Sequence, residues 1–308
     1  MRKILSLVIF LFSFVLLIGQ EEKKPVELAA FVISADNSLD VEDFMQKVLI
    51  DSSFYQAFIN LKYIPHDLRS TLFVRNKGEK QKGKLDRTAT QRLENEHRVV
   101  EILSEESNGR IYKKNGYHRY LTAEMYDEVF FPAEPEKVAP DIKSFEQVEI
   151  KGSKFDKYKS QLKKMMFNPG QEIVSVPFIG DKMDIFSEDM IGYYDFSIYS
   201  AYTDDSVYCH VFQVDVKDGV KSNKTVIKKM TSYFDKESMN VMSREYRLVN
   251  NTLLFEFDIW MKVENDFRGD KLLPRRIQYN GDWDVPFKGA EIINFDIRCR
   301  NYDLSVFR

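Results

Sequence analysis

The chain has 308 residues, of which 44% are hydrophobic and 14% aromatic, and its formal net charge is −3 at pH 7. A chain of this length is able to bury a large core, either as one large domain or as two small ones. Its weakly acidic balance lacks the basic surface on which nucleic-acid binding depends, so we expect no nucleic-acid partner. The high aromatic content favours β-sheets with wide apolar faces.

Residues 1–20 have the pattern of a secretory signal peptide. Arg2 and Lys3 form a basic start, and residues 4–18 are apolar apart from two serines. A run of about 15 apolar residues suits a signal-peptide core better than a transmembrane helix, which needs about 20. Cleavage after this region would remove two positive charges and change the net charge from −3 to −5. An uncleaved membrane anchor is the alternative.

The compartment follows from this leader. No cysteine lies where cleavage is expected, so a lipoprotein anchor is not indicated. We expect a periplasmic or extracellular protein that is not integral to the membrane after cleavage.

The region 21–131 is predicted to combine helices and strands. Apolar residues at helical spacing indicate helices at 41–49 and 51–61, and Asp40 is placed to cap the first of them. The other elements expected in this region are short strands at 68–75 and 97–103, a surface loop or long solvated hairpin at 76–92, and a short helix at 122–130.

Residues 132–152 hold three prolines and many charges, which is typical of a linker or outer loop. Ser153 is then placed to cap an amphipathic helix that ends at residues 168–170 (Asn-Pro-Gly). From about residue 195 onward, apolar and polar residues alternate in runs that turn signals separate. We therefore predict a helix plus an antiparallel β meander over 153–308, continuous with 21–131 as one domain.

The sequence contains no recognisable motif for nucleophilic, zinc or phosphate-loop chemistry. His210 stands beside Cys209, but adjacent strand residues point to opposite faces, so we predict no nucleophile–base pair. His118 and the pair Arg275-Arg276 are interpreted as ordinary surface charge, with contact to a phosphate or carboxylate as the alternative. We expect no catalytic residue, no metal site and no cofactor.

Two carboxylate pairs are the most enzyme-like feature. Asp282 and Asp284 flank a tryptophan, and Glu256 and Asp258 share one face of a predicted strand. Glycosidases use two carboxylates, which keeps a hydrolase as the third hypothesis for function. We interpret residues 280–282 (Asn-Gly-Asp) as a turn instead, and the other pair as the solvent face of the meander.

Both cysteines, Cys209 and Cys299, fall in predicted strands. An exported protein meets oxidising conditions, and a disulfide closing so long a loop would stabilise the fold by roughly 4–5 kcal/mol. Two free buried thiols are the alternative, and both remain open.

The helix after residue 153 carries one apolar stripe, formed by Phe155, Tyr158, Leu162, Met165 and Met166. Such a stripe packed on a sheet forms a core in the first place. If the sheet curves without closing, the same side chains line a cavity for an acyl chain, and the methionines suit an adaptable wall. That second interpretation requires a cavity of roughly 300 Å³ or more.

Five segments make the chain resemble a family of exported proteins of double-membraned bacteria that has no assigned activity. They are DSSFYQAFINLKY (51–63), HRYLTAEMYDEVFF (118–131), FNPGQEIVSVPFIGDKMDIF (167–186), SYFDKESMNVMSREYRL (232–248) and KLLPRRIQYNGDWDVPFK (271–288). More distantly, the last two segments are similar to successive strands of the periplasmic lipoprotein-carrier superfamily. That resemblance implies a half-open barrel that shelters acyl chains. No residue matches the functional arginine motif of the carriers, so none is carried over.

The sequence thus predicts an α+β fold with a curved, half-open barrel-like antiparallel sheet packed by a few helices. The expected function is a non-catalytic carrier or binding protein for an apolar or lipidic ligand. The alternative is an interaction subunit of a cell-envelope protein assembly.

Overall fold

The computed structural model describes residues 32–34, 39–139, 165–170, 179–251, 256–285 and 289–307. The predicted signal peptide, most of the predicted linker, and the stripe residues Phe155, Tyr158 and Leu162 lie outside these ranges. The described strands are β1 (Val32–Ser34), β2 (His66–Arg75), β3 (Gln81–Glu94), β4 (His97–Gly109), β5 (Glu136–Lys137), β6 (Tyr194–Tyr202), β7 (Tyr208–Val216), β8 (Ile227–Asp235), β9 (Val241–Asn251), β10 (Glu256–Arg268), β11 (Lys271–Val285) and β12 (Gly289–Arg300). The helices are α1 (Val41–Ile50), α2 (Ser53–Tyr63), α3 (Leu121–Phe130) and α6 (Glu188–Ile191), with short 3₁₀ turns η2 (Asp181–Met183), η3 (Ser222–Lys224) and η4 (Leu304–Phe307).

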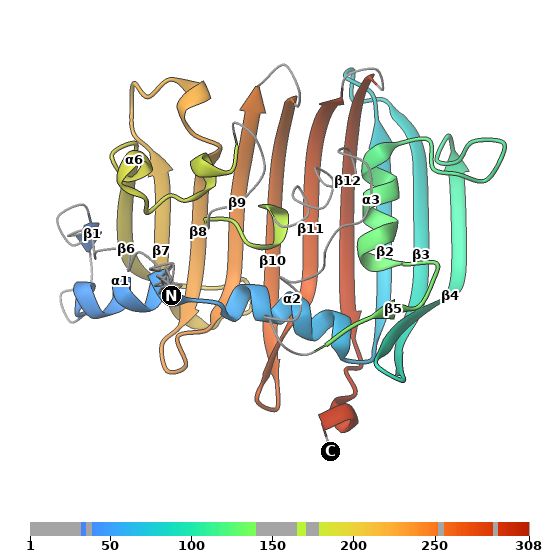
Figure 1. Ribbon diagram of the computed structural model, residues 1–308, viewed down its shortest axis with the longest axis horizontal. Coiled ribbons are helices and arrows are strands. Elements are labelled where there is room, and N and C mark those ends of the chain that lie inside the picture. The colour runs from blue at the N-terminus through green and yellow to red at the C-terminus, as the bar shows by residue number, and fades with distance from the viewer. Residues whose placement is uncertain are drawn as a thin grey trace, which may run out of the picture.

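All these strands belong to one sheet, in the order β1-β6-β7-β8-β9-β10-β11-β12-β2-β3-β4-β5 (Figure 1). Only β1 pairs in parallel, with β6, and the other neighbouring pairs are antiparallel. The sheet is curved. Its two end strands do not pair with each other, so it is open. This arrangement confirms the predicted α+β, half-open barrel-like fold.

One face of the sheet is continuously apolar. Directly paired residues point to the same face, so the strand register traces a row of buried side chains across eight strands. The row is Val214, Met230, Tyr246, Met261, Tyr279, Phe295, Leu72 and Leu85. The opposite face carries charged residues such as the ion pair of Arg247 and Asp258. The prediction of a meander with one apolar and one wet face is confirmed.

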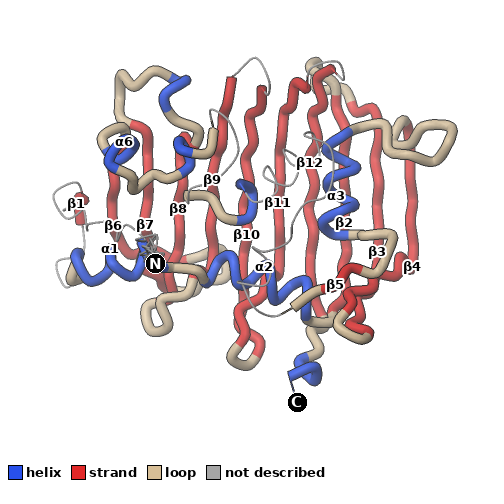
Figure 2. Tube along the Cα trace, in the orientation of Figure 1, coloured by secondary structure: helices blue, strands red, loops and turns tan. Residues whose placement is uncertain are grey.

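The helices lie over the apolar face, on the viewer's side of the strands in Figure 2. Ring contacts fix them there: Phe44 of α1 lies 5.5 Å from Phe234, and Phe54 of α2 lies 6.5 Å from Tyr246. The first two helices and the Asp40 cap were predicted from the sequence, and Asp40 indeed accepts a hydrogen bond from the Asp43 amide at 3.0 Å.

The polar stretch 76–92, predicted as a loop or a long solvated hairpin, consists of the turn 76–80 and most of β3, which forms a hairpin with β2. Leu85 and Ala89 point into the core, as expected for an alternating strand. Arg87 and Gln91 occupy the same buried face, with 4% and 1% of their surface exposed. Because these polar side chains fill inward-facing positions, the alternation of apolar and polar residues that marks a strand is not visible in this part of the sequence.

Strand β11 runs without a break through residues 279–282, where the sequence predicted a turn. That prediction is wrong. A Cβ atom at Gly281 would overlap the hydroxyl of Tyr279, whose side chain covers the glycine. The glycine therefore makes room for an aromatic ring within a strand and does not form a turn.

Candidate functional site

The apolar face under α3 carries a cluster of aromatic rings, which we call the aromatic groove: Tyr126, Phe130, Tyr279, Trp283 and Phe295. The Phe295 ring stacks on Tyr279 at 4.7 Å and lies 5.1 Å from Tyr126. Trp283 donates a hydrogen bond to the Tyr279 hydroxyl at 2.5 Å. Burial raises the pKa of Tyr126 and Tyr279 well above the usual value for tyrosine, so both stay neutral. The groove is an uncharged, aromatic surface.

Helix α3 forms one wall of the groove and is fixed at both ends by the sheet. It has no capping side chain of its own; instead the buried Glu291 accepts the Leu121 and Thr122 amides at 2.9 and 3.0 Å. At the other end, Arg98 donates to the carbonyls of Val129 and Phe130 at 2.9 and 3.0 Å. A carboxylate at the N-terminus and a guanidinium at the C-terminus both complement the helix dipole. This wall is therefore rigid.

Helix α2 forms the second wall and is fixed in a similar way. Before its first turn, Asp51 pairs with the buried Arg244 of β9 at 3.3 Å. At its C-terminal end, Gln91 donates to the carbonyls of Leu61 and Ile64 at 2.8 and 2.9 Å.

Between these walls lies the segment 165–170. Met165 and Met166 are buried core residues, and the Tyr246 hydroxyl donates a short hydrogen bond to the Met166 carbonyl. The Phe167 ring lies 4.5 Å from Phe58 and 6.3 Å from Phe130. The sequence placed Met165 and Met166 in the apolar stripe but gave Phe167 no role, since it falls at the end of the predicted helix.

Two small apolar gaps remain around this segment, of about 20 and about 40 Å³. Phe167, Val129 and Phe130 line both of them, and Met166 lines the first. An acyl chain needs roughly 300 Å³ or more, so neither gap holds one. In this structure the described stripe residues form core. Phe167 borders both gaps and, unlike Val129 and Phe130 of α3, it belongs to the segment between the two helices.

A larger cavity of about 320 Å³ opens beside the start of α2, but its character is polar. Its lining is Ser53, Gln56, Asn60, Asn240, Phe267, Asp270, Lys271, Leu272 and Phe307. Gln56 donates to Asn60, and Asn60 donates to the Leu272 carbonyl, at 2.9 and 3.0 Å. These amides hold the structure together, and the cavity does not offer the apolar wall predicted for an acyl ligand.

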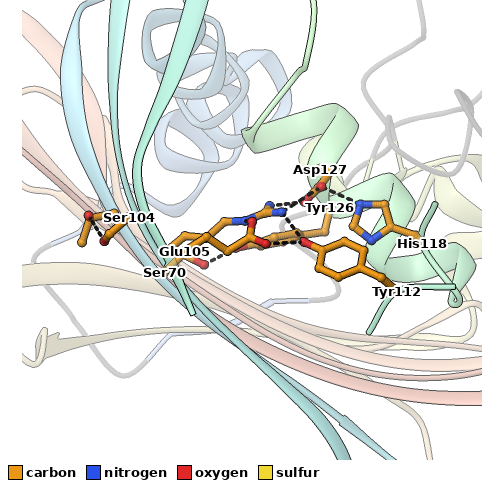
Figure 3. Close-up of polar contacts among 9 residues, drawn as sticks. Ser70, Ser104, Glu105, Tyr112, His118, Tyr126 and Asp127 are labelled. Carbon is orange, nitrogen blue, oxygen red and sulfur yellow. Dashed lines mark hydrogen bonds and ion pairs between the residues drawn. The ribbon is translucent and has the colours of Figure 1, made fainter. Parts of the chain in front are cut away.

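A polar cluster joins β3, β4 and α3 beside the groove (Figure 3). Arg87 donates to Asp127 and Glu105, and Asp127 also contacts His118 at 2.5 Å. Burial alone would lower the pKa of Arg87, but its bonds to Asp127 and Glu105 raise it. The Nδ1 atom of His118 has no hydrogen-bond partner, so no described hydroxyl or thiol is placed for it to deprotonate. The cluster is a structural tie, and His118, which the sequence assigned to ordinary surface charge, is bonded to Asp127 within it.

The other predicted cationic pair is also neutralised. Arg275 pairs with Asp205 and Glu264, and Arg276 pairs with Asp296 at 2.5 Å. Among the described residues, no group of three or more His, Cys, Asp or Glu side chains is arranged to hold a metal ion. Nor does any helix in the described ranges have the length and apolar character needed to cross a bilayer.

The two cysteines are free and buried, so the second of the two alternatives holds in this structure. Cys299 points to the apolar face with Phe295, whereas Cys209 points to the opposite face from its neighbour His210. Four strands separate them, a span on the order of 20 Å, while a disulfide needs Cα atoms within about 7 Å. Burial raises the pKa of Cys209 to about 11 and that of Cys299 to about 12.

The paired carboxylates meet on the wet face of the sheet. In the register of β10 and β11, Asp258 lies opposite Asp282 and Glu256 lies opposite Asp284. The solvent-face interpretation of Glu256 and Asp258 is therefore correct. Partial burial, and then the neighbouring carboxylates Asp258, Asp284 and Glu256, raise the pKa of Asp282 despite the proximity of a lysine.

Asp282→Asn is expected to stabilise the fold by about 0.5 kcal/mol at pH 7, since like charges directly opposite are destabilising and the exposed site is screened. The folded-state pKa of Asp282 is raised, so wild-type stability falls as pH rises through that pKa. The gain should vanish below about pH 4, where the carboxyl is neutral in both states. Urea unfolding of the wild type and the variant at pH 7 and pH 3 measures the gain in stability and its loss at low pH. A stabilisation that persists at pH 3 would contradict the electrostatic cause.

No family model matches the chain, and no curated protein matches it in sequence. Among solved structures, it is similar to an outer membrane lipoprotein-sorting protein domain from Vibrio parahaemolyticus, at 9% identity and a TM-score of 0.28, over 85% of this chain and 90% of that one. It is also similar to a DUF1329 family protein from Desulfovibrio piger, at 10% identity and a TM-score of 0.27, over 85% and 90% of the two chains. A LolA superfamily protein from Nitrosomonas europaea matches at 12% identity and a TM-score of 0.22, over 83% and 96%. These descriptions agree with the distant resemblance noted in the sequence, and no ligand or residue role is transferred from them.

Proposed function

We propose that this protein is a non-catalytic carrier for an apolar or lipidic ligand, and that the ligand takes the place of Phe167 in the aromatic groove. The observation that supports this most is that the two apolar gaps share Phe167 as a lining residue. Movement of this ring away from Phe58 and Phe130 would join the gaps into one apolar channel between α2 and α3.

Helices α2 and α3 are anchored differently from the segment 165–170, and this difference supports the same proposal. Glu291 and Arg98 hold α3, and Arg244 and Gln91 hold α2, by buried charged or amide groups. Phe167 is held by ring contacts, which an acyl chain replaces with contacts of the same kind. Exchange of ring for ligand therefore needs little net free energy, and the walls keep their shape.

The proposed compartment is the periplasm, and the ligand is then a lipid or an acyl chain of the cell envelope. The leader pattern of residues 1–20 supports export. Mass spectrometry of gently purified protein, extracted without detergent, is expected to show a co-purifying acyl lipid.

Phe167→Ala is expected to bind a fluorescent palmitic-acid analogue about tenfold more tightly than the wild type. The reason is that a half-buried phenylalanine ring no longer competes, and about 1.4 kcal/mol corresponds to a factor of ten. Fluorescence titration of purified, delipidated protein gives the dissociation constants.

Phe186→Ala provides the matched control, since Phe186 stacks on Phe196 and Phe212 at 5.8 and 6.1 Å, away from the groove. This variant should lose stability without a gain in affinity. Equal probe affinities for the wild type and Phe167→Ala, or no binding by either, would refute the proposed site.

A further inference from the structure

Strand β4 is the outermost long strand of the sheet, and most of its outer edge has no partner among the described residues. β5 pairs only with its first two residues, His97 and Arg98 (Figure 1). Within the part of the chain that the structure describes, residues 99–109 pair with β3 on one side and with no strand on the other. An edge of this length presents a row of unpaired backbone N–H and C=O groups, which is a template for an added strand.

The middle of this edge is apolar and exposed. Ile102 has 42% of its surface exposed and Leu103 has 61%. The register shifts at this point, because Ser104 pairs with Thr88 and Ile102 with Ala89, which leaves Leu103 as the extra residue of a bulge. Large apolar side chains are uncommon on an open edge and give an incoming strand an anchor.

All the charged residues within 99–109 are negative. Residues 99–109 contain Glu101, Glu105 and Glu106 and no lysine or arginine. Arg92 and Arg87 of β3 already pair with the first two glutamates. Glu106 lies directly opposite Asp86, whose own ion pair is with Lys84 at 2.6 Å, and among the described residues Glu106 has no ion-pair partner. A cation placed on the free side of Glu106 would give this carboxylate a partner.

We propose that the edge of β4 over residues 99–109 binds an extended, basic segment of a partner protein as an additional strand. Ile102 and Leu103 contact its apolar side chains, and Glu106 pairs with its lysine or arginine. A second copy of this chain is disfavoured, because two β4 edges would bring acidic residues against acidic residues. The main-chain pairing supplies affinity, and the charge supplies selectivity. This edge is separate from the aromatic groove, so the inference is independent of the proposed ligand.

The test uses a synthetic peptide of alternating lysine and valine, with an alternating glutamate and valine peptide as the charge control. The lysine peptide is expected to bind the full-length protein and to slow amide hydrogen exchange within residues 99–109. The glutamate peptide should bind at least tenfold more weakly. Equal binding of both peptides would overturn the proposal.

Two variants separate docking from folding. Leu103→Lys and Glu106→Lys should each weaken binding of the lysine peptide at least tenfold. Both should leave the unfolding midpoint close to that of the wild type, because Leu103 and Glu106 are exposed. Glu237→Lys, on the exposed turn between β8 and β9, is the matched control and should bind as the wild type does.

Two results would show that another occupant covers the edge and would overturn the proposal. The first is protection of these amides in the free, monomeric protein, which means that the chain covers its own edge. The second is a dimer in light scattering that Leu103→Lys converts to a monomer.

Discussion

Arg98→Met is expected to lower the free energy of unfolding by about 3–5 kcal/mol, the cost of removing one partner from a buried charged network. The side chain is only 2% exposed, and it binds Gln91, Glu136 and the last carbonyls of α3. Without the guanidinium these acceptors are left unsatisfied, and the C-terminal end of α3 loses its anchor. Urea unfolding followed by tryptophan fluorescence measures the loss.

Arg92→Met is the matched control in the same hairpin. Arg92 is about half exposed and pairs with Glu94 and Glu101 on the surface. Exposed ion pairs contribute little, so this variant should unfold close to the wild type. If the two variants lose similar stability, Arg98 is not the anchor that the geometry indicates.

Lowering the pH from 7 to 4 is expected to cost about 3 kcal/mol of stability through His66 alone. Burial, and then the nearby Arg98, lower the pKa of His66 from 6.5 to about 4, against the opposing effect of its bond to the Ile64 carbonyl. Between these two values the unfolded chain binds a proton that the folded protein does not. Stability therefore falls as the pH drops from about 6.5 to about 4, and this contribution is fully present above 6.5.

The hydrogen bonds of the His66 imidazole explain why burial disfavours its protonated form. Nδ1 lies 2.8 Å from the Ile64 carbonyl and must donate to it. The buried Nε2 has no acceptor among the described residues for the hydrogen bond that a second proton would need. His66→Asn should flatten the pH dependence of the unfolding free energy between pH 4 and 7. His97→Asn, at the turn between β3 and β4, should retain it. A wild-type profile that stays flat in this range would show that His66 is not the titrating group.

The alternation of apolar and polar residues was enough to predict most of the sheet, because the described strands after residue 195 bury alternate side chains over much of their length. β3 was ambiguous, since Arg87 and Gln91 fill core positions that the composition marks as polar. Gly281 misled the prediction, because its role depends on the Tyr279 side chain two residues away. The ambiguity at β3 and the error at Gly281 each arise from one or two residues within a single strand.

The site itself depends on pairings that no local pattern reveals. Glu291 caps a helix that begins 170 residues earlier, and Arg98 closes the same helix from another strand. The sequence marked Met165 and Met166 by their helical spacing, but the position of Phe167 between two rigid walls follows only from the three-dimensional arrangement. Charged residues such as Glu291 and Arg98, and a residue at the end of a helix such as Phe167, belong to no sequence pattern that indicates these roles.

The junction of β12 with β2 has a consequence for the order in which the protein is assembled. Ile297 pairs with Ser70, so the last strand of the chain joins the early hairpins to the rest of the sheet. The β2–β4 portion can pair with β12 only when nearly the whole polypeptide is available, and pairing of such high sequence separation is slow. Until β12 pairs with β2, one edge of β2 stays unpaired, and exposed strand edges of this kind make incomplete chains prone to aggregate.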